Sequence, residues 1–257
     1  MPRLPAARKL NASFSPSYIP VAVFVGGTAG IGQGMAEAFA RYTKGNAHIV
    51  IIGRNRTAAE AIISSFPKPT VEEGGDLPVH EFIPCDASLM KNVEATTTEL
   101  LSRLPKVNFL VLSPGYLSLS KEKTEEGIDA RFALYYYARW KFTHDLLPLL
   151  HNAKQAGEDA KVMSVLSAGK GGQIDLDDLG LKKNDSVGQV AKAMPTYNDL
   201  MIEVIPRFQH FHLDVNKYYV FTNRNLLLGS QKCLLCMSTL VPFGQTFYYP
   251  LMGPCAR

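Results

Sequence analysis

The 257-residue sequence is poor in cysteine and carries little net charge. Its four cysteines are too few and too unevenly spaced to form the disulfide framework of a small secreted domain. The 27 basic and 23 acidic side chains leave a formal charge of +4, which is too small and too dispersed to indicate a nucleic-acid partner. The pair Cys233 and Cys236 lacks a second pair of ligands, so we expect no metal site.

A secretory signal and a long uninterrupted hydrophobic run are also missing. No apolar segment follows the basic residues within positions 1–20, as a signal peptide would require. Residues 233–256 carry no charged side chain, but Pro242 and Pro250 interrupt them, so a membrane-spanning helix is not expected there. We interpret this stretch as a buried or oligomer-facing tail, and we expect a cytoplasmic protein with no membrane partner.

Hydrophobic patterning indicates a folded α/β chain. Apolar residues make up 46% of the sequence and charged residues 19%, which excludes a disordered or coiled-coil chain. Short runs rich in β-branched residues alternate with segments in which apolar residues recur at helical spacing. This alternation predicts a doubly wound parallel sheet with helices on both faces, in a single domain.

The patterns also give approximate bounds for these elements. The expected strands span residues 18–25, 48–52, 79–84, 109–112 and 162–166. The expected helices include residues 57–66, 88–104, 124–150 and a segment that Pro195 opens. Weaker patterns predict a sixth strand at residues 217–222 and a helix at residues 225–240.

A glycine-rich turn joins the first expected strand to the first expected helix. Gly26, Gly30 and Gly32 follow the spacing G-x-x-x-G-x-G. Glycines at a strand-to-helix junction let backbone N–H groups and a helix N-terminus approach the oxygen atoms of a diphosphate. The turn therefore predicts a nucleotide site, although a plain turn between two elements stays the alternative.

These glycines, together with Asp86 after the third expected strand, resemble the short-chain dehydrogenase/reductase superfamily. The resemblance covers residues 18–205, and Val25 replaces the threonine of the family motif T-G-x-x-x-G-x-G. It implies a Rossmann-like domain over residues 18–257 that diverges after residue 205, with residues 1–17 as an N-terminal extension. It also assigns cofactor contacts to Gly26, Thr28, Gly30, Ile31, Gly32, Arg54, Asn55, Asp86 and Gly115.

The end of the second expected strand bears on the choice of cofactor. Members of this superfamily that use NAD place an acidic residue there, whereas this chain has Arg54 followed by Asn55 and Arg56. A guanidinium group can neutralise and bind the 2′-phosphate of NADP. NADP is therefore favoured over NAD, unless the two arginines only form a solvated loop.

The resemblance also implies a catalytic pair. Ser167, after the fifth expected strand, would orient the substrate oxygen, and Tyr197 would exchange the proton while the nicotinamide moves the hydride. The alternative is an ordinary serine at the end of a strand and a tyrosine that only packs its helix. The acidic segment between them is similar to the insertion of fungal long-loop members.

The lysine of the family motif is missing. Position 201, one helical turn after Tyr197, is Met, and a thioether supplies no positive charge to lower the pKa of the tyrosine. Lys192 and Lys170 are weak candidates for a substitute. Tyr135 stands where the family usually has an asparagine. The sequence therefore supports cofactor binding better than it supports efficient chemistry.

Two functions are compatible with these features. The first is an NADP-dependent oxidoreductase that acts on the carbonyl or alcohol group of a small apolar metabolite, as in secondary metabolism. The alternative is an NAD(P)-binding protein with weak or lost catalysis that acts as a regulator or partner. A homo-oligomer is compatible with the resemblance, because the family forms dimer contacts along the helix expected at residues 124–150.

Overall fold

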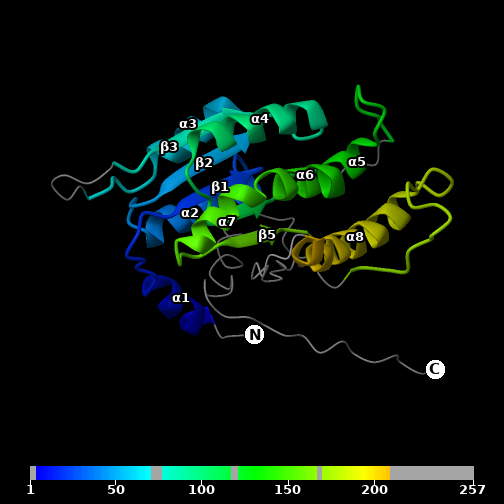
Figure 1. The fold of residues 1–257 in the computed structure, drawn as a ribbon. Helices are drawn as coiled ribbons and strands as arrows, with labels where there is room; N and C mark the ends of the chain where they lie inside the picture. Colours follow the sequence, from blue (N-terminus) through cyan, green and yellow to red (C-terminus); the bar gives the residue numbers. More distant parts are fainter. Residues whose placement is uncertain (1–3, 71–76, 117–120, 167–169, 209–257) are drawn as a thin grey trace.

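The computed structural model describes residues 4–70, 77–116, 121–166 and 170–208. Five strands form one sheet in the order β3-β2-β1-β4-β5, and every neighbouring pair is parallel (Figure 1). The strands are β1 (Val21–Val25), β2 (His48–Gly53), β3 (His80–Pro84), β4 (Phe109–Leu112) and β5 (Lys161–Ser164). These bounds agree with the strands expected from the sequence to within about three residues.

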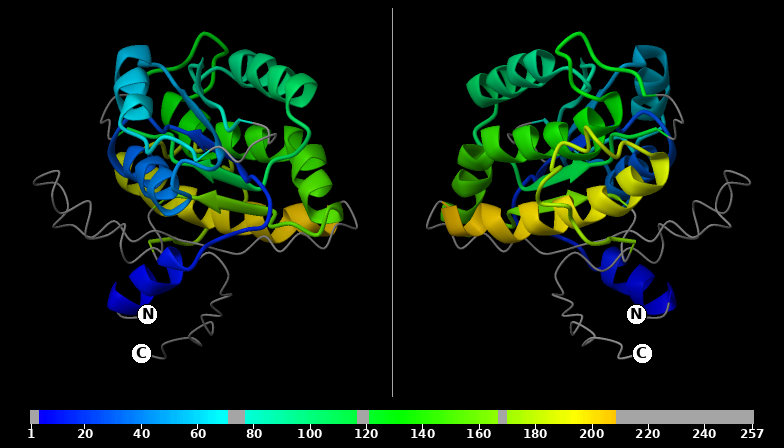
Figure 2. Two further views of the ribbon diagram at one scale, coloured as in Figure 1. Left: turned by 90° about the vertical axis from the view of Figure 1, so that its left-hand side faces the viewer. Right: turned by 90° about the vertical axis from the view of Figure 1, so that its right-hand side faces the viewer.

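Helices occupy both faces of this sheet. They are α1 (Leu4–Ala12), α2 (Gly30–Tyr42), α3 (Arg56–Ser64), α4 (Met90–Arg103), α5 (Ala130–Phe132), the π-helical turn η1 (Ala133–Tyr137), α6 (Ala138–Asp145), α7 (Leu147–Gln155) and α8 (Val187–Phe208). Figure 2 shows the sheet between its helical layers in two opposite views.

The alternation of side chains along the strands builds the two cores. Val23 and Leu110 belong to a buried apolar cluster with α4, α6 and α7. Their neighbours along the strands, Phe24 and Val111, belong to a second cluster with α2 and α3. Successive side chains of a strand point to opposite faces, so each strand contributes to both layers. The expected doubly wound, Rossmann-like fold with helices on both faces is therefore confirmed.

The N-terminal segment packs against one of these layers. The ring of Phe14, after α1, lies 6.2 Å from that of Phe39 and 5.9 Å from that of Phe109, measured between centroids. The division into an extension over residues 1–17 and a domain over residues 18–257 stays a prediction.

The expectation of one helix over residues 124–150 is wrong. Helix α5 begins only at Ala130, because the side chain of Asp129 accepts a hydrogen bond from the backbone of Arg131 and caps it. The chain then passes through the π turn, and Leu146 separates α6 from α7. Pro148 has no N–H group and cannot continue a preceding helix, which explains this break.

The expectation that Pro195 opens a helix is also wrong. Helix α8 already begins at Val187, and Pro195 and Lys192 both lie inside it. The hydroxyl of Ser186 accepts a hydrogen bond from the backbone N–H of Gln189 at 3.3 Å, which is the contact of an N-cap. Ser186 is therefore the residue that caps the start of α8.

Several expectations concern residues beyond the described ranges. The sixth strand at residues 217–222, the helix at residues 225–240 and the cysteine pair of residues 233–236 all lie outside the described residues. Within the described ranges, no helix combines the length and the apolar character needed to cross a bilayer.

Asn108 connects the strands at the amino edge of the sheet. Its side chain is fully buried, and its Oδ1 accepts a hydrogen bond from the backbone N–H of Val21 at 2.9 Å. Its Nδ2 donates to Glu158 Oε2 at 2.9 Å and to the carbonyl oxygen of Asp159 at 2.8 Å. One amide group thus holds the start of β1 to the segment that precedes β5.

We expect Asn108→Ala to lower the free energy of unfolding by about 3 kcal/mol, because it leaves buried polar groups without partners. Asn152→Ala is the matched control, since its Nδ2 makes one exposed hydrogen bond, to the carbonyl oxygen of Pro105. The control should cost less than about 1 kcal/mol. Urea unfolding of both variants checks the prediction, and equal losses would contradict it.

Candidate functional site

A cleft opens at the carboxyl ends of β1, β4 and β5. Strands β1 and β4 are neighbours in the sheet. The connection after β1 leads to β2 on one side of them, and the connection after β4 leads to β5 on the other side, so the two connections run in opposite directions. Open α/β sheets bind ligands at such a point. The cleft has a volume of about 460 Å³ and is lined by Ala29–Ile31 after β1, Ser113–Tyr116 after β4, Val165 and Leu166 after β5, and side chains of α5, η1, α6 and α8.

The glycine turn brings the N-terminus of α2 to this cleft. A Cβ atom at Gly32 would lie 2.3 Å from the carbonyl oxygen of Gly26, and one at Gly26 would lie 2.7 Å from the backbone of Ser113. Gly30 has a φ of +59°, and its Cα faces open space. The N-cap residue Ala29 makes no side-chain hydrogen bond, so the helix has no cap of its own. The amide groups of its first turn are therefore available to an anion.

The end of β2 presents one guanidinium group to solvent. Arg54 is exposed and makes no ion pair with any residue that the structure describes. Arg56 instead pairs with Glu60 at 3.6 Å. Asn55 caps α3, since its side chain accepts a hydrogen bond from the N–H of Ala58 at 3.0 Å. Of these three residues, Arg54 is the one available for a ligand.

The remaining positions that the resemblance assigns to the cofactor lie along the same edge. Thr28 lies beside the end of β2, because a Cβ atom at Gly53 would lie 2.9 Å from its Cγ2. Asp86 follows β3, and its Oδ1 accepts hydrogen bonds from the N–H of Ser88 at 2.9 Å and from its hydroxyl at 2.7 Å. Gly115 lines the cleft and leaves room for the ring of Tyr135.

The expected catalytic tyrosine does not line the cleft. The hydroxyl of Tyr197 donates a hydrogen bond to the carbonyl oxygen of Leu179 at 2.9 Å, and its ring packs edge-on against that of Tyr136 at 5.6 Å. Burial and the nearby carboxylate of Asp178 raise the pKa of Tyr197. Ser167 lies outside the described residues. The catalytic roles of Ser167 and Tyr197 therefore stay predictions.

Position 201 and the two candidate lysines also lie away from the cleft. Met201 is 3% exposed and belongs to the apolar cluster beneath α4 and α6. Lys170 and Lys192 are both exposed, and neither lines the cleft. None of these three residues brings a positive charge to the cleft.

A buried arginine that the sequence analysis missed lies in the wall of the cleft. Arg139, on α6, is 1% exposed, and its Nη1 donates to the carbonyl oxygen of Leu112 at 3.0 Å and to Ser164 Oγ at 2.7 Å. Its Nη2 donates to the carbonyl oxygen of Pro114 at 2.7 Å. Burial lowers the pKa of the guanidinium group to about 9, so it is still charged at neutral pH. A charged residue within the apolar stripe of its helix was the available signal.

Arg139 belongs to a chain of buried hydrogen bonds that reaches α8. The hydroxyl of Ser164 donates to Asn198 Oδ1 at 3.0 Å. The Nδ2 of Asn198 donates to the carbonyl oxygen of Tyr135 at 2.7 Å and to that of Met194 at 2.9 Å. Asn198 thus occupies the side of α8 that faces the sheet, and the adjacent Tyr197 points elsewhere.

Comparison with known proteins agrees with this geometry. The family model described as short chain dehydrogenase matches residues 20–174, more than half of the chain. The chain belongs to the short-chain dehydrogenase family. Oxidoreductase AN1596 of Emericella nidulans is 38% identical over 187 residues, which are 72% of this chain and 53% of the relative.

Other matches are more distant. Oxidoreductase andH of Emericella variicolor is 29% identical over 204 residues, 79% of this chain and 58% of that protein. A short-chain dehydrogenase from Sphingobium yanoikuyae in complex with NADPH has a TM-score of 0.56 and 16% identity, covering 79% of this chain and 70% of that chain. It shows a likeness of fold. The chain spans about half the length of the curated relatives it matches.

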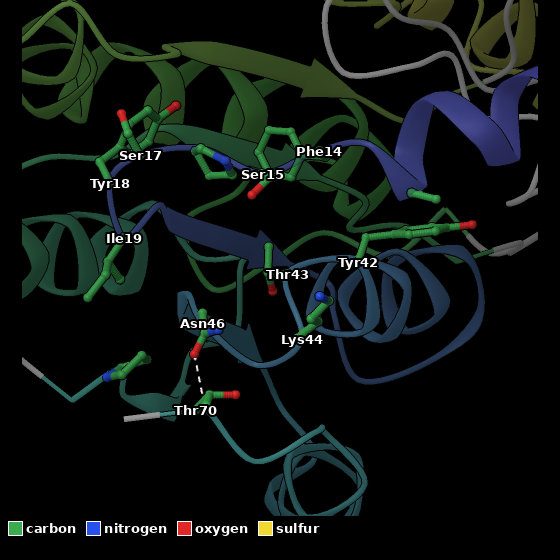
Figure 3. Close-up of a pocket in the computed structure, with 13 residues that line it drawn as sticks. Phe14, Ser15, Ser17, Tyr18, Ile19, Tyr42, Thr43, Lys44, Asn46 and Thr70 are labelled. Atoms are coloured by element: carbon green, nitrogen blue, oxygen red, sulfur yellow. Dashed lines mark hydrogen bonds between the residues drawn. The ribbon is translucent and has the colours of Figure 1, made fainter. Parts of the chain in front are cut away.

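This short-chain dehydrogenase has a second hollow, of about 520 Å³, at the opposite edge of the sheet. Figure 3 shows Tyr18, Tyr42, Lys44 and Asn46 around it, with Asn46 Oδ1 accepting a hydrogen bond from the N–H of Thr70 at 3.0 Å. The C-terminal end of α2 lies here, and the partial negative charge of a helix C-terminus disfavours an anion. The cleft at the carboxyl edge is therefore the candidate site.

We expect Gly32→Ala to lower the free energy of unfolding by about 1–3 kcal/mol, because the new methyl group must displace the backbone at Gly26. Gly188→Ala is the control, since a Cβ atom at this helical glycine meets nothing within 4 Å. The control should raise the stability by about 0.5–1 kcal/mol. Denaturant unfolding measures both, and stabilisation by Gly32→Ala would contradict the close approach.

Proposed function

We propose that this short-chain dehydrogenase is an NADP-dependent oxidoreductase acting on the carbonyl or alcohol group of a small apolar metabolite. The observation that carries the proposal is the uncapped N-terminus of α2, which faces the cleft at the point where the sheet connections diverge. Fungal oxidoreductases among the relatives support a role in secondary metabolism.

The chain's residues suit the parts of such a cofactor. The amide groups of Gly30, Ile31 and Gly32 would hold the diphosphate, and no cap competes with it. Asp86 Oδ2 would accept a hydrogen bond from the adenine amine, since the hydrogen bonds from Ser88 go to Oδ1. When bound, a reduced nicotinamide supplies a hydride ion to the substrate.

Arg54 supports NADP over NAD. Its exposed guanidinium group lies after the C-terminal end of β2, where the superfamily binds the adenosine ribose, and it has no described ion pair of its own. A phosphate monoester can accept two parallel hydrogen bonds from a guanidinium group. A 2′-phosphate would thus find a partner there, whereas no acidic side chain stands at this position to bind the hydroxyls of NAD.

The lining of the cleft supports an apolar substrate. Val187, Val190 and Met194 form a stripe along the facing side of α8, and Ile31 and Leu166 lie on other walls. Such a surface excludes water from the reacting atoms and favours apolar over charged substrates. The substrate and the direction of the reaction belong to the proposal.

A specific observation also favours the second candidate, a nucleotide-binding protein without useful turnover. The hydroxyl of Tyr197 donates a hydrogen bond to the carbonyl oxygen of Leu179, and Met201 is buried among apolar side chains. Catalysis by Tyr197 would require its hydroxyl to leave this partner. The two candidates share the cofactor and differ in whether NADPH is consumed.

We expect the protein to bind NADPH in isothermal titration calorimetry, and Arg54→Glu to weaken this binding about 10- to 100-fold while changing NADH binding little. The reason is that a carboxylate repels the 2′-phosphate. Arg41→Glu, at an exposed position on α2, is the matched control and should bind NADPH like the wild type.

Oxidation of NADPH in the presence of apolar aldehydes and ketones then separates the two candidates. Turnover supports the oxidoreductase, and tight binding without any turnover supports the second candidate. Absence of binding to NADPH and NADH alike would contradict both.

A further inference from the structure

Arg131 has an unpartnered nitrogen atom in the wall of the cleft. The residue belongs to α5, is 2% exposed and lines the cleft together with Val187 and Val190 of α8. Its Nη1 is buried and has no hydrogen-bond partner among the residues that the structure describes. A buried N–H group without an acceptor costs free energy that a suitable oxygen atom would restore. Nη1 therefore indicates a binding site for an acceptor from outside the chain.

The rest of this guanidinium group is held in a fixed orientation. Its Nε donates to Asp129 Oδ1 at 3.0 Å, and its Nη2 donates to Asp129 Oδ2 at 2.6 Å. The Nη2 also donates to the carbonyl oxygen of Asp185 at 3.2 Å, just before α8 begins. Two parallel hydrogen bonds to one carboxylate fix the plane of a guanidinium group, so Nη1 is the corner that lies away from Asp129. A donor that is already ordered loses little entropy when a ligand binds.

Arg139, the other arginine that lines the cleft, is bonded differently. Each of its nitrogen atoms donates to a backbone carbonyl oxygen, and Nη1 also donates to the hydroxyl of Ser164. These acceptors come from the chain itself and hold the ends of the strands. Of the two arginines, Arg131 is therefore the one with a nitrogen atom left for a ligand.

The charge of Arg131 is already balanced. The hydrogen bond to Asp129 raises the pKa of Arg131, so the guanidinium group stays charged at neutral pH and the pair carries no net charge. A second carboxylate at Nη1 would be repelled by Asp129 and would have to leave water for a wall formed in part by Val187 and Val190. A neutral oxygen avoids both costs and still receives a hydrogen bond from a charged donor.

We propose that Arg131 Nη1 binds a second oxygen atom of the substrate, a neutral carbonyl or ester oxygen that lies apart from the reacting group. The assignment rests on the proposed function and narrows its substrates to apolar molecules that carry this additional acceptor. Arg131 determines specificity and takes no part in the transfer of the hydride. Its hydrogen bond is the same in the bound substrate and in the transition state, so it acts mainly on KM.

Matched substrates test the proposal in the full chain. Keto methyl esters with progressively longer methylene spacers are reduced with NADPH, each beside the plain methyl ketone of equal chain length and the free keto acid. At the spacer that fits, the wild-type kcat/KM for the ester should exceed that for the ketone by about 10-fold or more, mainly through a lower KM. The keto acid should be reduced less well than its ester.

Arg131→Lys removes the unpartnered corner but keeps a positive charge for Asp129. The preference for the ester over the ketone should fall to within about twofold, while kcat/KM for the ketone and the Kd of NADPH stay within about threefold of the wild type. Arg103→Lys is the matched control, because Arg103 pairs with Glu81 and Glu99 and does not line the cleft. It should keep the wild-type preference.

Asp129→Asn provides a second variant that leaves Nη1 in place. Asparagine can still cap α5, but Arg131 loses its counter-charge, which a carboxylate at Nη1 would then supply. The kcat/KM for the keto acid should rise by about 10-fold or more relative to that for the ester. This test holds even where Arg131→Lys fails to fold.

Two kinds of failure can be told apart. Equal kcat/KM for ester and ketone at every spacer, a preference that survives in Arg131→Lys, or a wild type that prefers the keto acid would overturn the assignment and leave the proposed function in place. A wild type that binds no NADPH, or that reduces none of these carbonyl compounds, would overturn the proposed function and the assignment with it.

Discussion

The lack of room for a Cβ atom at Gly32, which would lie 2.3 Å from the carbonyl oxygen of Gly26, is the constraint on which the carboxyl edge of the sheet depends. This close approach lets the chain leave β1, turn and start α2 within a few residues, so that the first amide groups of the helix face the cleft. A side chain at either position would meet backbone atoms. Since no side chain caps this helix, the same tight turn leaves a site where an anion is stabilised.

The other wall of the cleft depends on Arg139. Its guanidinium group holds the ends of β4 and β5 and the turn at Pro114, and Ser164 and Asn198 extend these contacts to α8. The two walls of the cleft are therefore built by different means. The wall at the glycine turn depends on positions without side chains. The wall at Arg139 depends on a buried charged group that donates its hydrogen bonds to neutral oxygen atoms.

Periodicity predicted the sheet well because buried parallel strands are short, apolar and bounded by glycine and proline. The glycine turn was equally visible, since its motif follows local backbone geometry. The helix ends and the direction of Tyr197 depend on tertiary contacts instead. The π turn at Ala133–Tyr137 changes which side chains reach the cleft, and no local pattern predicts it.

The most direct test of a dinucleotide site at the carboxyl edge is a titration with NADPH followed by amide NMR. We expect saturable shifts that are largest for the amides of Gly30, Ile31, Gly32 and Arg54. Shifts confined to the hollow at the amino edge, around Thr43 and Asn46, or no saturable shift at any described residue, would contradict it.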